Sequence, residues 1–96
     1  MKILTNKLAE NWFTTIGYVN EKPVTYIRYK ITRPKEIYVE HNETVLRERG
    51  KGYASELLRA LRKEYPIVKG NWRNDKAKKF WEKQGAKFRS RSFEME

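Results

Sequence analysis

Residues 47–54 read RERGKGYA, and both the fold and the candidate site follow from this stretch. Gly50 and Gly52 stand one residue apart, directly before an amphipathic segment. Glycine permits the backbone angles that turn several amide groups toward one point, and it leaves room there for a ligand. The unpaired amides and the positive dipole end of a following helix favour an anion at that point. The stretch therefore predicts a phosphate-binding turn, with Arg49 and Lys51 among its cationic side chains.

On its own, this turn is equally consistent with a plain strand-to-helix connection whose basic side chains are solvated. It contains neither the G-x-x-x-x-G-K-[ST] sequence of nucleoside triphosphatases nor the G-x-G-x-x-G sequence of dinucleotide-binding proteins. The neighbouring segments are needed to decide between a binding loop and an ordinary connection.

The residues before the turn are typical of strands. Residues 12–20, 24–32 and 36–43 are rich in β-branched and aromatic side chains, and a turn at residues 20–23 joins the first two. We therefore expect a hairpin followed by a third antiparallel strand.

The residues after the turn change to a helical period. Apolar side chains recur at helical spacing over residues 54–65, and Pro66 ends that helix. Residues 67–72 are a short strand candidate. Residues 74–85 predict a second helix that begins at an Asn-Asp cap and ends at a glycine, before a last strand over residues 88–95.

The resulting order, β-β-β-α-β-α-β, predicts the fold class. We expect an α/β (α+β) protein with a mixed, largely antiparallel twisted sheet and helices on its faces. Because 96 residues leave room for one domain only, we expect residues 1–96 to form a single domain.

Composition narrows the possible functions. The chain has no cysteine and one histidine, which excludes disulfides, zinc ribbons, iron–sulfur clusters and thiol nucleophiles. Lys and Arg number 22 against 12 Asp and Glu, a formal charge of +10 that indicates an anionic partner. No apolar run approaches the roughly 18 residues of a membrane span, and the first residues lack a secretory signal. We therefore expect a cytoplasmic protein that has no membrane partner.

Two segments together resemble the GNAT (GCN5-related N-acetyltransferase) superfamily, as a short member. Residues 49–54 match the R-x-x-G-x-[GA] signature with which that family binds the pyrophosphate of acetyl-coenzyme A. Residues 74–88, NDKAKKFWEKQGAKF, resemble its second motif, N-x-x-A-x-x-[FL]-Y-E-K-x-G-F, at the right distance downstream. The resemblance covers about residues 36–88, and the helical pair that usually follows the family's first strand has no room here.

The resemblance implies an N-acetyltransferase with acetyl-coenzyme A as co-substrate and no metal. The acetyl group would pass directly to a primary amine of a small molecule or a protein. The cofactor would lie on the loop, the helix start, the end of the third strand and the second motif. The implied cofactor-binding residues are His41, Asn42, Glu43, Thr44, Arg49, Gly50, Lys51, Gly52, Tyr53, Ala54, Ser55, Asn74, Phe80 and Trp81.

Two carboxylates are candidates for the catalytic base, which is useful because an alkylamine is mostly protonated at neutral pH. Glu36 lies 13 residues before Arg49, and this spacing resembles the glutamate base of the family's histone-acetylating branch. Glu40 lies nearer the expected acetyl position, on the same strand face. The alternative is that both carboxylates only offset the positive charge of an exposed strand face.

The clearest departure from the family pattern is Trp81, which stands where a tyrosine usually protonates the leaving sulfur. An indole N–H can donate a hydrogen bond but cannot release its proton near neutral pH. Trp81 is alternatively a core residue, so a GNAT-like domain that binds a partner without efficient transfer is a second interpretation.

A third interpretation is a nucleic-acid-binding module. The formal charge of +10 and the basic and aromatic residues between positions 72 and 91 are consistent with it. No helix-turn-helix, zinc-finger or RNA-recognition signature is present, however. A monomer and a homodimer are both consistent with the sequence.

Overall fold

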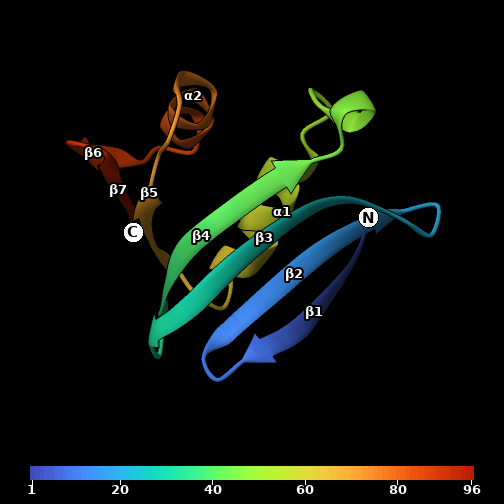
Figure 1. Cartoon of the computed structure of the whole chain (residues 1–96), viewed down its shortest axis with the longest axis horizontal. Helices are drawn as coiled ribbons and strands as arrows, with labels where there is room; N and C mark the ends of the chain where they lie inside the picture. Colours follow the sequence, from blue (N-terminus) through green and yellow to red (C-terminus); the bar gives the residue numbers. More distant parts are fainter.

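The computed structural model describes all 96 residues and contains one seven-stranded sheet and two α-helices (Figure 1). The strands, in chain order, are β1 (Lys2–Ala9), β2 (Trp12–Val19), β3 (Lys22–Arg33), β4 (Glu36–Thr44), β5 (Ile67–Asn71), β6 (Lys87–Arg89) and β7 (Ser92–Met95). The helices are α1 (Tyr53–Arg62) and α2 (Asp75–Lys83), and a short 3₁₀ turn, η1 (Leu46–Glu48), precedes α1.

The strands lie side by side in the order β1-β2-β3-β4-β5-β7-β6. Every neighbouring pair is antiparallel except β4 and β5, which are parallel because α1 carries the chain from the end of one to the start of the other. The fold class predicted from the sequence, a mixed and largely antiparallel sheet with helices, is therefore confirmed.

Two elements differ from the predicted order. β1 was not predicted, because it is an edge strand whose side chains are almost all exposed and so carry no continuous apolar pattern. The single strand predicted over residues 88–95 is a hairpin of β6 and β7. Its turn places Ser90 in the left-handed region, at φ 56°, without the glycine that usually marks such a turn.

α1 forms because its apolar residues return on one side of the helix every three or four positions. Leu57, Leu58 and Leu61 are buried, and they belong to one hydrophobic cluster with the fully buried Ile27 of β3 and Ile37 of β4. α1 therefore packs across β2, β3 and β4, on the far side of the sheet in Figure 1.

α2 begins and ends as predicted. The Asn74 side-chain oxygen accepts a hydrogen bond of 2.9 Å from the Ala77 N–H, which caps the helix, and Gly85 follows its end at φ 87°. Trp81 stacks on Phe93 of β7, with ring centroids 4.0 Å apart, and thereby joins α2 to the core.

Both helices cover the same face of the sheet. The Gln84 side-chain N–H, just after α2, donates to the Ser55 hydroxyl in the first turn of α1, at 2.8 Å. No helix lies over the opposite face of β1–β4 (Figure 1), which we call the open face. Apart from the aliphatic Ile16, its side chains are polar or aromatic, and most are half-exposed: Thr14, Tyr18, Tyr26, Arg28, Lys30 and Tyr38. Neither helix is long and apolar enough to cross a membrane.

Candidate active site

β4 and β5 pair over only part of their length. Their parallel pairing runs from Glu36 opposite Ile67 to Val39 opposite Gly70, whereas β4 continues to Thr44. Beyond this point the two strands separate, and the end of β4 presents backbone groups that no strand pairs on the β5 side (Figure 1). This free edge is a place where an extended, amide-containing molecule can bind to the backbone.

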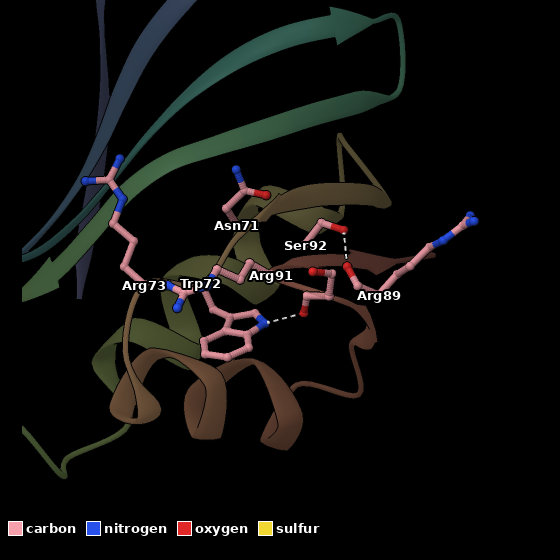
Figure 2. A pocket seen from close by; sticks show the side chains of 7 residues that line it. Asn71, Trp72, Arg73, Arg89, Arg91 and Ser92 are labelled. Carbon is pink, nitrogen blue, oxygen red and sulfur yellow. Dashed lines mark hydrogen bonds between the residues drawn. The ribbon is translucent and has the colours of Figure 1, made fainter.

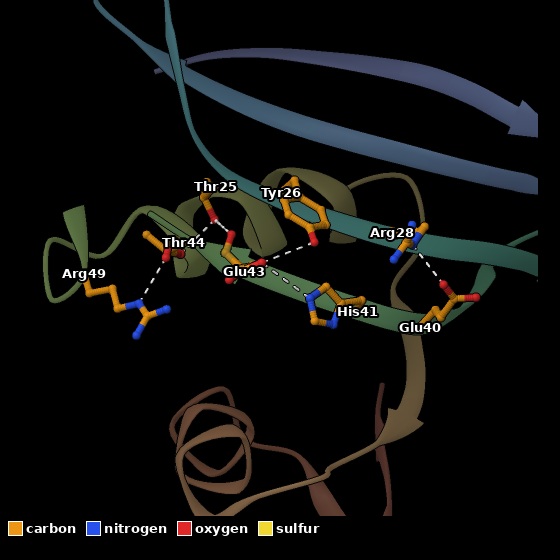
Figure 3. Close-up of polar contacts among 8 residues, drawn as sticks. All are labelled: Thr25, Tyr26, Arg28, Glu40, His41, Glu43, Thr44 and Arg49. Carbon is orange, nitrogen blue, oxygen red and sulfur yellow. Dashed lines mark hydrogen bonds and ion pairs between the residues drawn. The ribbon is translucent and has the colours of Figure 1, made fainter. Parts of the chain in front are cut away.

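A β-bulge lies where the two strands separate. Arg28 of β3 stands opposite His41, and the next residue, Tyr29, stands opposite Val39, so Glu40 has no cross-strand partner. Bulges re-aim the side chains that follow them, and they are common next to active sites. Because of this bulge, Glu40 and His41 both lie among the polar side chains of the open face (Figure 3).

The side chains around the bulge form two polar groups (Figure 3). Arg28 Nε lies 2.9 Å from Glu40 Oε1, and His41 Nε2 lies 3.6 Å from Glu43 Oε2. The Tyr26 hydroxyl donates to the same Glu43 oxygen at 3.4 Å, and partial burial together with this carboxylate raises the pKa of Tyr26. Sequence reasoning missed Tyr26 and Arg28, although the two-residue period of β3 places both on one face.

The end of β4 is fixed by hydrogen bonds from two sides. The Thr25 hydroxyl donates to the Glu43 carbonyl at 3.1 Å and lies 3.0 Å from the Thr44 hydroxyl. Arg49 Nε donates to the Thr44 carbonyl at 3.0 Å. Arg49 therefore ties the glycine loop to β4 and still leaves the other nitrogens of its guanidinium group for a ligand.

The loop itself has the geometry that its glycines predict. Gly50 and Gly52 lie in the left-handed region, at φ 81° and 83°, where other residues are strained. The first helical hydrogen bond of α1 is the 3.0 Å bond from the Glu56 N–H to the Gly52 carbonyl, so the N–H groups of Tyr53 and Ala54 have no acceptor within the helix. A Cβ at either glycine would meet no atom within 4 Å, so the space above both is open. The loop therefore fits an anion such as a diphosphate.

The charges around the loop are not all free. Lys51 Nζ lies 2.9 Å from Glu48 Oε2, and this hydrogen bond and ion pair raise the pKa of Lys51. A cavity of about 360 Å³ adjoins the loop, between the β2–β3 turn and η1, and Arg47 is among the residues that line it. Arg49 therefore supplies unpaired positive charge at the loop and Arg47 supplies it in the neighbouring cavity, whereas Glu48 offsets much of the charge of Lys51.

Glu36 lies at the opposite end of β4 from the loop and is held by several partners. The Thr32 hydroxyl donates to Glu36 Oε2 at 2.7 Å, and Lys69 Nζ lies 3.1 Å from the other oxygen. Arg33 Nε lies 4.0 Å from Oε2. The pKa of Glu36 is lowered, chiefly by the Thr32 hydrogen bond and against the opposing effect of burial, with Lys69 and Arg33 adding to the lowering.

Several solved structures resemble this arrangement of strands and helices. The structure of Tetrahymena GCN5 matches it with a TM-score of 0.74 and 14% sequence identity, over 91% of this chain and 69% of that one. The ribosomal-protein-S18-alanine N-acetyltransferase of Escherichia coli matches with a TM-score of 0.74 and 15% identity, over 91% and 68%. The chain has the GNAT fold.

The fold implied by the resemblance of residues 49–54 and 74–88 to the GNAT motifs is therefore confirmed. The PaiA N-acetyltransferase of Thermoplasma acidophilum, solved in complex with coenzyme A, matches with a TM-score of 0.70 and 15% identity. That match covers 85% of this chain and 57% of that one, so the present chain spans less than two thirds of the larger protein. No family model matches the sequence, and no curated protein matches it in sequence.

In this GNAT fold most of the cofactor-binding residues predicted from the sequence gather at one end of the sheet. The end of β4 (residues 41–44) and the loop with the start of α1 (residues 49–55) meet through the Arg49–Thr44 bond. Ser55 belongs to this group, but its hydroxyl already accepts the hydrogen bond from Gln84.

The predicted residues of the second motif make contacts that stabilise the fold. The side-chain oxygen of Asn74 is occupied by the cap of α2, and Phe80 packs edge-on against Trp81 at 4.9 Å. The cofactor-binding role of Trp81 stays a prediction, but only 1% of the residue is exposed, so its side chain packs in the core. The cause is Phe93, whose ring offers Trp81 a stacking partner that the sequence pattern does not reveal.

Proposed function

We propose that residues 1–96 form a single minimal acetyltransferase domain, which moves an acetyl group from acetyl-coenzyme A to a primary amine. One observation carries this proposal: the glycine loop at the start of α1 and the free edge of β4 lie at the same end of the sheet, joined by Arg49. An anion site next to an unpaired strand edge suits a ligand that has a diphosphate at one end and an amide-rich arm at the other. Coenzyme A has this composition, and it is the ligand of the PaiA structure.

The loop is proposed to anchor the cofactor through its diphosphate. The N–H groups of Tyr53 and Ala54 point out of the first turn of α1 without helical acceptors, and the positive end of the helix dipole adds to their attraction for an anion. Arg49 supplies a charge-assisted contact, and Gly50 and Gly52 leave the space for the ligand open.

The free edge of β4 is proposed to bind the rest of the cofactor. Residues 41–44 lie beyond the last pairing with β5, so their backbone groups on that side have no strand partner. Acetyl-coenzyme A, when bound, supplies the activated thioester and a thiol leaving group. Backbone N–H groups held rigidly at this edge can stabilise the negative charge that develops on the acetyl carbonyl oxygen.

Glu40 is the better supported of the two candidate bases. It lies on the bulge, where β4 leaves β5, and its side chain is 40% exposed on the open face, where an amine can approach. Glu36 is held by Thr32 and Lys69, and its lowered pKa makes it a weak proton acceptor. We therefore assign proton removal from the amine to Glu40, directly or through a water, and retain Glu36 as the weaker candidate.

The burial of Trp81 favours one alternative function, in which the domain binds acetyl-coenzyme A but transfers the acetyl group slowly. Because Trp81 is buried, its position supplies no group that can protonate the leaving sulfur. A thiol with a pKa of about 8.5 can leave as the thiolate without such a group, which is why transfer is still the primary proposal. A turnover assay with an amine panel separates the two, since both predict cofactor binding.

The first test is binding of coenzyme A, measured by calorimetry and by thermal unfolding. A ligand at 100 times its Kd stabilises the folded state by about 2.7 kcal/mol, which corresponds to a rise in Tm of about 13 °C for a domain of this size. We expect Gly52→Asp to abolish this rise, because it places a side chain and a negative charge in the proposed diphosphate site.

Two control variants make this result specific. Gly52→Ala introduces comparable backbone strain without the charge, so it should weaken coenzyme A binding less than Gly52→Asp does. Asn11→Asp adds the same charge at another residue with positive φ, in the exposed β1–β2 turn, and should leave binding unchanged. Undiminished affinity in Gly52→Asp would show that the cofactor does not use this loop.

A further inference from the structure

A cavity of about 420 Å³ lies at the end of β5 and is lined by Asn71, Trp72, Arg73, Arg89, Ser90, Arg91 and Ser92. We propose that it binds an anionic group, a carboxylate or a phosphate, and that in acetyl transfer this group belongs to the amine acceptor. The second part of the proposal rests on the proposed function, whereas the first part does not.

The charge of the cavity is unbalanced. Three of its seven lining residues are arginines and none is acidic. No carboxylate lies within ion-pair distance of Arg73, Arg89 or Arg91, although Glu36, Glu40, Glu43, Glu48, Glu56 and Glu94 all have basic partners elsewhere in the fold. Arginine binds carboxylates and phosphates in a planar, two-pronged manner, so three unpaired guanidinium groups favour ligands of that chemistry.

The backbone that carries these arginines is fixed. The Trp72 indole N–H donates to the Ser90 carbonyl at 3.1 Å, and the Trp72 backbone N–H donates to the Arg91 carbonyl at 2.9 Å. The Ser92 hydroxyl donates to the Arg89 carbonyl at 2.7 Å, which closes the β6–β7 turn (Figure 2). The end of β5 and the turn are therefore one rigid unit, although their residues are far apart in the sequence.

The side chains spread positive charge along this unit. In Figure 2 Arg73 extends toward the β4 side, Arg89 extends outward, and Arg91 lies beside Trp72. The Arg91 guanidinium carbon lies 5.7 Å from the centre of the Trp72 ring, and Lys78 Nζ lies 5.0 Å from it. Because two cations already lie against the indole, the ring is poorly suited to stack on a nucleic-acid base, and a small anion is favoured over RNA.

The position of the cavity connects it with acetyl transfer. Asn71 follows Gly70, the last residue of β5 that pairs with β4, so the cavity begins where the two strands separate. By the two-residue period of β5, Asn71 points to the same side as Lys69, whose ion pair with Glu36 lies on the face opposite the helices. An amine that approaches Glu40 from the open face could therefore place an attached anionic group among the arginines.

The test compares acceptors that differ only in the anionic group. The pairs are γ-aminobutyrate with butylamine, for a carboxylate, and phosphoethanolamine with ethanolamine, for a phosphate. We expect kcat/KM to favour the anionic member of at least one pair about tenfold or more, and the pair that responds identifies the group. The double variant Arg89→Gln with Arg91→Gln should reduce that preference to about twofold or less and leave coenzyme A affinity unchanged.

The matched control removes two positive charges elsewhere. Lys35→Gln with Arg59→Gln changes two exposed residues that have no ion pair and lie outside the cavity, so the preference should survive. Equal rates for anionic and neutral amines in the wild type would overturn the acceptor assignment. So would a preference that survives in the Arg89 and Arg91 variant. Tight binding of a single-stranded RNA oligomer that depends on Arg89 and Arg91 would assign the cavity to nucleic acid and also overturn it.

A second readout does not depend on catalysis. Inorganic phosphate at millimolar concentrations should shift the NMR signal of the Trp72 indole N–H, which a Trp72→Phe variant identifies, and the double arginine variant should abolish the shift. If coenzyme A does not bind but this shift occurs, the proposed function fails and the anion site stands. If coenzyme A binds and the Trp72 signal does not move, the anion site is refuted and the proposed function stands.

Discussion

At the residue scale, Glu36 and Glu40 show how the surroundings of a carboxylate decide what it can do. Both are on β4, four residues apart, and the sequence treats them alike. Glu36 is nearly buried and is held by Thr32 and Lys69, whereas Glu40 lies on the bulge with one partner, Arg28. The first arrangement stabilises a fixed negative charge, and the second leaves a carboxylate that a substrate can reach.

Glu40→Gln should slow acetyl transfer by about tenfold or more near neutral pH, because general bases contribute about 10²- to 10⁴-fold. Coenzyme A affinity should not change, since the substitution keeps the shape of the side chain and lies outside the glycine loop. The measurement is a pH profile of kcat/KM, and the loss should shrink as the pH rises and the amine deprotonates by itself. Glu10→Gln, in the exposed β1–β2 turn, is the control. An unchanged profile would transfer the base role to Glu36 or to water.

Glu36→Gln should change how stability depends on pH. Its pKa is lower in the folded chain than the value of about 4.3 in the unfolded chain, so its charge stabilises the fold above that pH. This contribution disappears as the pH falls through the folded-state pKa. Urea unfolding should therefore show a loss of about 1–2 kcal/mol for the variant near neutral pH, and a smaller difference from wild type in acid. A constant difference at all pH values would mean that the Thr32 and Lys69 contacts do not act through the charge.

At the scale of elements, α2 is attached to the sheet mainly through one side chain. Trp81 is buried, stacks on Phe93 at 4.0 Å and meets Phe80 edge-on. The close approach extends to β5, where a Cβ on Gly70 would lie 2.6 Å from the Phe93 ring. Packing therefore requires a glycine at position 70, and the interface between α2, β7 and β5 is too tightly packed to accept a larger side chain there.

Trp81→Ala should destabilise the fold by about 3–5 kcal/mol, as expected when a large buried aromatic side chain is removed. Trp81→Phe keeps an aromatic ring against Phe93 and should cost less. Leu46→Ala, at a side chain that is 75% exposed, should stay within about 0.5 kcal/mol of the wild type. The measurement is urea unfolding of the three variants, and a small effect of Trp81→Ala would contradict the core role and favour the predicted role in the cofactor site.

At the scale of the whole molecule, the basic residues that give the formal charge of +10 differ in whether a carboxylate lies beside them. Arg28, Lys51 and Lys69 are paired with carboxylates, whereas the arginines of the β5 cavity and Arg49 are not in ion pairs. The loop and the cavity are therefore two places where basic side chains have no carboxylate partner that would compete with an anionic ligand.

The affinity for coenzyme A should depend only moderately on salt. We expect a loss of less than about tenfold between roughly 50 and 200 mM salt, since few phosphates are neutralised. A nucleic-acid ligand with six to ten phosphate contacts would lose about 10³- to 10⁵-fold over the same range. Calorimetry with coenzyme A and with an RNA oligomer at several salt concentrations measures how each affinity falls with salt. Submicromolar affinity for RNA that falls as steeply as this would favour the nucleic-acid interpretation.

The local features of this molecule could be predicted from its sequence, because the residues themselves specify them. Gly50 and Gly52 are where the backbone needs a positive φ, Asn74 caps α2, and the leucines of α1 mark its buried side. The bulge at Glu40 could not be predicted, because it arises from the register between β3 and β4. For the same reason Trp72 and Arg91, which are distant in the sequence, form one cavity only after β5 and β7 have paired.

The short pairing of β4 with β5 also divides the sheet. β1–β4 with α1 form one block, and β5–β7 with α2 form another, and the seam between them has four paired positions. Helix packing and the Ser55–Gln84 bond also cross this seam. The amides of β4 beyond Val39, which have no partner on the β5 side, should exchange faster than the paired amides of the seam, and a molecule that binds along this edge would slow exchange in both blocks at once. Occupancy of the site would then be visible in the dynamics of strands that the ligand never touches.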